Sequence, residues 1–184
     1  TGSEASIVAV VTDGEGKRKI PIVSDELLPD LVILDPSLTT TLSSAVTAYT
    51  AMDAFTHAVE SYCSTINNRL ADNYSVPAAK SIVRHLSTAI SDPENLDARE
   101  ELQYAAMFAG MAQNMTSVGA THALSHAVGA AGGVAHGMGN AIFLRGVLSF
   151  NAEESPKPSV FANEIGFSSL DGMVDWISEI LQQA

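Results

Sequence analysis

The segment MDAFTHAVESY, Met52–Tyr62, decides the fold, because it combines an apolar helical pattern with two potential metal ligands. The apolar side chains recur at helical spacing, which predicts a face that packs into a core: Met52, Phe55, Val59 and Tyr62. Asp53 and His57 lie one helical turn apart, beside this stripe. Taken alone, the pair fits either an exposed contact on a helix surface or half of a metal site.

A second histidine group lies further along the chain. His122 and His126 repeat the four-residue spacing in THALSHAVG, and His136 follows in GGVAHGMGN. Glycines 132, 133 and 137 would let the backbone bring a third imidazole over the other two. Burying neutral imidazoles requires a partner for each ring nitrogen, and polar side chains are few here. Two explanations stay open, structural histidines bonded to backbone and a divalent metal site, and the spacing makes His126 and His136 equally good ligands.

The charge and hydrophobicity of the chain restrict its class. Of its 184 residues, 46% are hydrophobic and 16% charged, so a substantial core is expected in one domain or in most of a two-domain protein. The net charge of −12 argues against a nucleic-acid partner. Residues 102–144 carry no Asp, Glu, Lys or Arg, but polar residues interrupt their apolar runs, which predicts a helical-domain interior and no membrane span. Cys63 is the only cysteine, and no secretory signal opens the chain, so a cytoplasmic location is expected.

The order of the elements predicts a mainly α fold. Residues 6–13 and 17–24 are expected to form a β-hairpin around a turn at DGEG, and residues 30–36 a buried strand. Six helices are expected after Leu38, with Pro77 near the start of the second: 42–63, 75–90, 92–115, 120–131, 137–151 and 169–184. So few strands would have exposed edges unless they belonged to a larger sheet.

The start of the chain fits this expectation. It has no initiator methionine and opens as if within a strand, so a longer protein is expected with the missing sheet upstream of Thr1. Residues 1–38 are then expected to be the C-terminal end of an α/β (Rossmann-like) domain. Residues 39–184 are expected to form an all-helical metal-binding domain.

Five segments together resemble the iron-containing (group III) alcohol dehydrogenases, of the dehydroquinate synthase-like superfamily. They are TGSEAS, LVILDPSL, MDAFTHAVESY, GATHALSHAVGA and AHGMGNAIFL, and the resemblance extends from Thr1 to about Asn151. It implies an N-terminal α/β domain that binds NAD or NADP and a C-terminal helical domain that holds the metal, with the active site between them. It also implies that the cofactor phosphate-binding loop precedes Thr1, so activity is expected only in the full-length protein.

The resemblance assigns a role to individual residues. It implies four metal ligands: Asp53, His57, His122 and His136. His126 matches a histidine near the nicotinamide and substrate that is not a ligand, and it is implied to be catalytic. The resemblance also implies four contacts to the cofactor or its cleft: Thr1, Ser6, Lys19 and Leu38. A solvated hairpin charge at Lys19 and a core position at Leu38 are the non-functional alternatives.

The implied activity is hydride transfer between a small alcohol and NAD(P), with His126 relaying the proton to solvent. The donor set suits Fe(II), and zinc would also bind to it. Members of the family are commonly dimers or larger homo-oligomers. Alternative enzymes are a glycerol dehydrogenase, a dehydroquinate-synthase-like zinc enzyme and a metal-independent maleylacetate-reductase-like enzyme. The non-enzymatic alternative is a helical scaffold with structural histidines.

Overall fold

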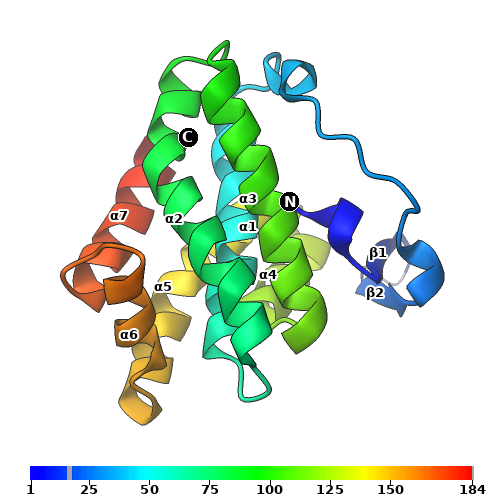
Figure 1. The fold of residues 1–184 in the computed structure, drawn as a ribbon. Helices are drawn as coiled ribbons and strands as arrows, with labels where there is room; N and C mark the ends of the chain where they lie inside the picture. Colours follow the sequence, from blue (N-terminus) through cyan, green and yellow to red (C-terminus); the bar gives the residue numbers. More distant parts are fainter. Residues whose placement is uncertain (16–17, 184) are drawn as a thin grey trace.

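Helix α1 (Ser44–Cys63) lies at the centre of the computed structural model, which describes residues 1–15 and 18–183 (Figure 1). The side chain of Ser43 caps its first turn by accepting a hydrogen bond from the Val46 N–H at 3.3 Å. Helices with extensive packing against α1 are α2 (Arg69–Ser91), α3 (Leu96–Thr116), α5 (His136–Glu154), α6 (Lys157–Glu164) and α7 (Leu170–Gln183). As a result, every residue from Ala51 to Tyr62 is buried.

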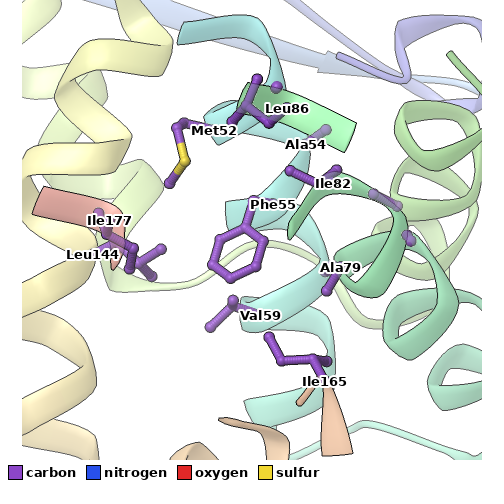
Figure 2. Packing of buried hydrophobic residues seen from close by; sticks show 14 of the residues in the cluster. Met52, Ala54, Phe55, Val59, Ala79, Ile82, Leu86, Leu144, Ile165 and Ile177 are labelled. Carbon is purple, nitrogen blue, oxygen red and sulfur yellow. The ribbon is translucent and has the colours of Figure 1, made fainter. Parts of the chain in front are cut away.

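The apolar stripe of α1 packs between α2 on one side and α5 and α7 on the other (Figure 2). Phe55, which is 0% exposed, has its ring centroid 5.1 Å from that of Trp176 in α7. Other large buried side chains around this stripe come from α2, α5, α6 and α7: Ile82, Leu86, Leu144, Leu148, Phe161, Met173, Ile177 and Ile180. The sequence prediction that this stripe is a core face is therefore confirmed.

The β-hairpin lies at one side of the bundle, beside α4 (Ala120–Gly132) and α3 (Figure 1). Strands β1 (Val8–Asp13) and β2 (Arg18–Val23) pair antiparallel, with Val8 opposite Val23. Asn114 of α3 holds the start of the hairpin: its Oδ1 accepts from the Ile7 N–H at 3.0 Å, and its Nδ2 donates to the Ala5 carbonyl. Gly16 of the predicted turn and Lys17 of the second predicted strand lie outside the described residues.

The mainly α fold is confirmed, but three details of the prediction are wrong. Residues 31–35 form no strand in the described chain, because no neighbouring strand pairs with them, and Leu31 and Ile33 are 76% and 80% exposed. Helix α2 begins at Arg69 because Asn68 caps the Leu70 and Ala71 N–H groups, which leaves Pro77 inside the helix. Helix α6 was not predicted. No helix of the described residues is long and apolar enough to cross a membrane.

Two glycines near the turn from α4 to α5 are needed for different structural reasons. Gly133 ends α4 with a φ of 68°, a left-handed conformation that glycine adopts without strain. Gly137, in the first turn of α5, lies directly against α1, and a Cβ there would come 1.9 Å from the Tyr49 carbonyl oxygen. The turn thus does bring His136 back over α4, and the close approach at Gly137 sets how deeply α5 packs on α1.

The packing at Gly137 yields a prediction with a matched control on the same helix. Gly137→Ala should lower the free energy of unfolding by about 1–3 kcal/mol, because α1 and α5 must separate to admit the methyl group. Gly146→Ala should raise it by about 0.5–1 kcal/mol, since nothing lies within 4 Å of a Cβ there and alanine favours a helix. Urea unfolding of both variants measures the difference, and equal shifts of the same sign would contradict the packing described for Gly137.

Candidate metal centre

Helix α1 contributes three polar side chains to one face, at helical positions i, i+4 and i+7. Asp53, His57 and Glu60 are 4%, 8% and 8% exposed. Because α1 is surrounded by other helices, this face points inward, toward α4 and α5, and not toward water. The alternative of a solvent-exposed Asp53–His57 contact is therefore wrong.

Helices α4 and α5 bring two more imidazoles to Asp53. Its Oδ1 lies 3.5 Å from His122 Nε2, 3.3 Å from His136 Nε2 and 4.0 Å from His57 Nε2. Potential ligand atoms of Asp53, His122 and His136 all lie within 4.8 Å of one another. His57 stacks on His122, with ring centroids 4.7 Å apart and planes 13° from parallel.

Hydrogen bonds fix which nitrogen two of these rings present. The Nδ1 of His122 lies 2.6 Å from Glu60 Oε2, so it carries the proton and leaves Nε2 as the acceptor. The Ser125 hydroxyl donates to the His136 carbonyl oxygen at 2.8 Å, and it must therefore accept the His136 Nδ1–H at 3.1 Å. In their neutral forms, both rings thus direct an Nε2 lone pair toward Asp53.

Asn140, fully buried on α5, shows that this cluster has more acceptors than donors. Its Nδ2 lies 2.6 Å from Asp53 Oδ1, 3.1 Å from His122 Nε2 and 3.4 Å from His136 Nε2. An amide nitrogen has two hydrogens, so it cannot satisfy three acceptors at once. A cation among these atoms would satisfy the remaining lone pair.

The donor set fits a divalent transition metal. A tetrahedral ion with bonds of about 2.1 Å needs ligand atoms about 3.4 Å apart. The distances from Asp53 Oδ1 to His122 and His136 are close to this value, and His57 is about half an ångström further away. One carboxylate with neutral imidazoles is a ligand chemistry that iron and zinc both accept.

Without metal, the imidazoles of the site differ in the direction in which their pKa values are shifted. Burial lowers the pKa of His57 and of His136 to about 4. Burial opposes protonation of His122 too, but its hydrogen bonds to Asp53 and Glu60 raise its pKa to about 9. Burial would also raise the pKa of Asp53, but the surrounding imidazoles, His57 foremost, hold it well below its usual range. At neutral pH without metal, His122 therefore carries a second proton, on the Nε2 that faces Asp53, and a metal ion bound there would displace it.

A cavity of about 670 Å³ opens beside the cluster. His57, His122 and His136 form part of its wall, and His126 adds a ring 4.9 Å from that of His136. Burial and then the charge of Lys19 lower the pKa of His126. A neutral imidazole at the wall of a cavity can exchange a proton with a ligand bound there.

The residues assigned to the cofactor fall into two groups. Thr1 and Ser6 line the cavity. Lys19 is half-buried against α4, where its Nζ lies 3.6 Å from the point that a Cβ on Gly129 would occupy. It is therefore not a fully solvated hairpin charge. Leu38 is 77% exposed and is not among the residues that line this cavity. The alternative of a core position for Leu38 is wrong, and its role in the cleft stays a prediction.

Three polar residues of the site were not predicted from the sequence: Glu60, Ser125 and Asn140. Each lies one helical turn, three or four residues, from a predicted ligand on the same helix: His57, His122 and His136, respectively. That spacing was the available signal, because it places them on the ligand-bearing face. Their partners lie on other helices, and only the tertiary structure shows them.

Comparisons with known proteins identify the family to which the chain belongs. The profile described as "Fe-containing alcohol dehydrogenase family, C-terminal" matches residues 47–168. This chain belongs to the Fe-containing alcohol dehydrogenase family. It is 38% identical to the 1,3-propanediol dehydrogenase of Klebsiella pneumoniae, over 98% of this chain and 48% of the relative. It is 36% identical to the 1-propanol dehydrogenase PduQ of Citrobacter freundii, over 84% of this chain and 42% of the relative.

Solved structures of the family share the fold. The sulfoacetaldehyde reductase from Bifidobacterium kashiwanohense, solved in complex with NAD+, superposes with a TM-score of 0.92 at 32% identity, over all of this chain and 49% of that one. A 1,3-propanediol oxidoreductase gives a TM-score of 0.87 at 38% identity, over all of this chain and 50% of that one. The chain therefore spans about half the length of these Fe-containing alcohol dehydrogenase relatives.

The proton on His122 predicts how metal binding depends on pH. Loading chelator-treated protein with Zn²⁺ at pH 7 should release roughly one proton per ion, since an imidazole must be neutral to bind a metal. The affinity for Zn²⁺ should rise about tenfold per pH unit from about pH 4, near the pKa of His57 and His136, to about pH 9, near the pKa of His122. Calorimetric titration in buffers of different ionisation enthalpy counts the protons. If no proton were released, His122 would not hold the proton that its hydrogen bonds to Asp53 and Glu60 are expected to maintain.

Proposed function

We propose that the full-length protein is a metal-dependent alcohol dehydrogenase that transfers hydride between a small alcohol and NAD or NADP. The convergence of Asp53, His122 and His136 on one point beside a cavity carries the proposal. His57, stacked on His122 and 4.0 Å from Asp53, is the fourth proposed ligand. Fe(II) is the proposed ion, with Zn(II) as the alternative that the same donors accept.

Each residue has a proposed task. Asp53 and the three imidazoles hold the ion, which when bound would polarise the oxygen of the alcohol or carbonyl substrate. Ser125 holds His136 in the tautomer that binds metal, and Asn140 orients the Asp53 carboxylate. His126, on the cavity wall 4.9 Å from the His136 ring, is proposed to pass the alcohol proton to solvent.

The cofactor is proposed to enter from the side of the hairpin. Thr1 and Ser6 line the cavity together with the histidines, and Lys19 lies above α4 nearby. We propose that residues 1–38, Leu38 among them, complete an α/β cofactor domain and that residues 39–184 form the helical domain. The NAD+ complex of the similar sulfoacetaldehyde reductase supports a dinucleotide in this family.

The substrate class follows from relatives. Those with 35–38% identity are named for 1-propanol, 1,3-propanediol and methanol, so a short primary alcohol, or its aldehyde in reverse, is proposed. The full-length protein is further proposed to be a cytoplasmic homo-oligomer. Its single cysteine suits a reducing compartment, and Ile142 and Phe150 leave apolar surface on α5. Analytical ultracentrifugation tests the assembly, and a monomer would refute that part.

Removal of single ligands tests the proposal. His57→Ala and His122→Ala in the full-length protein should lose stoichiometric metal, because each removes a side chain that binds the ion directly. Both should reduce NAD(P)-linked alcohol oxidation by at least about a hundredfold. His85→Ala, the matched change at the histidine on α2 outside the cluster, should retain both properties. Metal analysis and nicotinamide absorbance with a panel of short alcohols are the measurements.

The two readouts separate the alternatives. Full metal content in His57→Ala and His122→Ala would refute the ligand assignment. Absence of both metal and turnover in the unmodified full-length protein, purified without chelator, would favour a scaffold with structural histidines.

A further inference from the structure

Glu60 is a buried carboxylate that none of the proposed catalytic steps uses. It lies on α1, one turn beyond His57, and is 8% exposed. A buried carboxylate is costly unless hydrogen bonds compensate it, so its partners indicate what it is for.

Three donors, all from the start of α4, converge on this carboxylate. Oε2 accepts from the Gly119 N–H at 2.7 Å and from His122 Nδ1 at 2.6 Å, and Oε1 accepts from the Thr121 N–H at 2.7 Å. No side chain of α4 caps its own first turn, because the N-cap residue is Gly119. Glu60 of α1 therefore supplies the cap from another helix and grips the imidazole in the same contact.

Only an acceptor-only group satisfies this arrangement. A carboxylate accepts from all three donors, whereas an amide must turn its NH₂ toward at least one of them. In one orientation the NH₂ opposes the Thr121 N–H, which breaks the cap of α4 and displaces His122 with it. In the other orientation the NH₂ faces His122, so that Nδ1 becomes the acceptor and Nε2 carries the proton. A protonated Nε2 has no lone pair for a metal ion.

We infer that Glu60 is the positioning residue of the metal site, which fixes both the tautomer of His122 and the place of α4 relative to α1. The inference rests on the proposed function, because it concerns the same ion. Through α4, Glu60 also sets where His126 stands, four residues after His122. Glu60 itself touches neither substrate nor cofactor.

The test compares Glu60→Gln with Glu164→Gln in the full-length protein. Glu164 is a matched control, because its carboxylate also accepts a side-chain hydrogen bond, from the Tyr62 hydroxyl at 3.2 Å, but lies away from the cluster. Chelator-competition titration with Zn²⁺ gives affinity, and the visible absorption of the Co²⁺-loaded protein at saturation reports the ligand geometry. Thermal unfolding in excess chelator reports the fold without metal.

Glu60→Gln should weaken Zn²⁺ binding by about 10- to 100-fold, as is typical when a partner of a ligating histidine is lost. It should also shift the Co²⁺ bands, and Glu164→Gln should stay within about twofold with unchanged bands. Affinity within twofold of the unmodified protein would overturn the inference. Weaker affinity with unchanged Co²⁺ bands at saturation would also overturn it, since this is what a merely structural role produces.

Two further outcomes are distinguishable. If Glu60→Gln does not fold, Glu60→Asp takes its place under the same criteria, because its shorter carboxylate withdraws from His122 while remaining an acceptor. If the unmodified protein binds no metal, the proposed function fails and the inference about Glu60 fails with it. If only the inference is wrong, the unmodified protein and Glu60→Gln both bind metal with the same affinity.

Discussion

The burial of the Asp53 carboxylate is the constraint on which the rest of this structure depends. An ionised carboxylate inside a helical domain is unfavourable unless positive charge and hydrogen bonds surround it. The imidazoles of His57, His122 and His136 and the amide of Asn140 converge on it from three helices. A divalent ion at this point would compensate the carboxylate charge, which without metal is offset by the protonated His122.

That constraint accounts for the burial of α1 from Ala51 to Tyr62. This part of the helix carries the Asp53 cluster on one face and core residues such as Phe55 on another, so no face is left for solvent. Helix α5 packs directly on α1 at Gly137, next to His136. Glu60 joins the same helix to the start of α4. The same contacts therefore determine both the geometry of the site and the packing of the helices.

The sequence predicted six of the seven α-helices in the described chain and the spacing of Asp53 and His57, because helical periodicity and one-turn pairs are local properties. It missed the start of α2, where Asn68 provides a cap, and it assigned a strand to residues 30–36, where no partner strand is present among the described residues. Apolar composition predicts a strand, but pairing needs a neighbour. Glu60 and Asn140 were missed because their partners are on other helices, and the ligand set itself came from family resemblance.

Asp53 and three imidazoles are proposed to bind one divalent ion. X-ray absorption at the metal edge of the full-length protein, loaded with one Fe²⁺ or Zn²⁺ per chain, tests this most directly. We expect a nitrogen and oxygen shell at about 2.0–2.2 Å with the outer-shell scattering of about three imidazoles. A shell of oxygen ligands without imidazole scattering would contradict it.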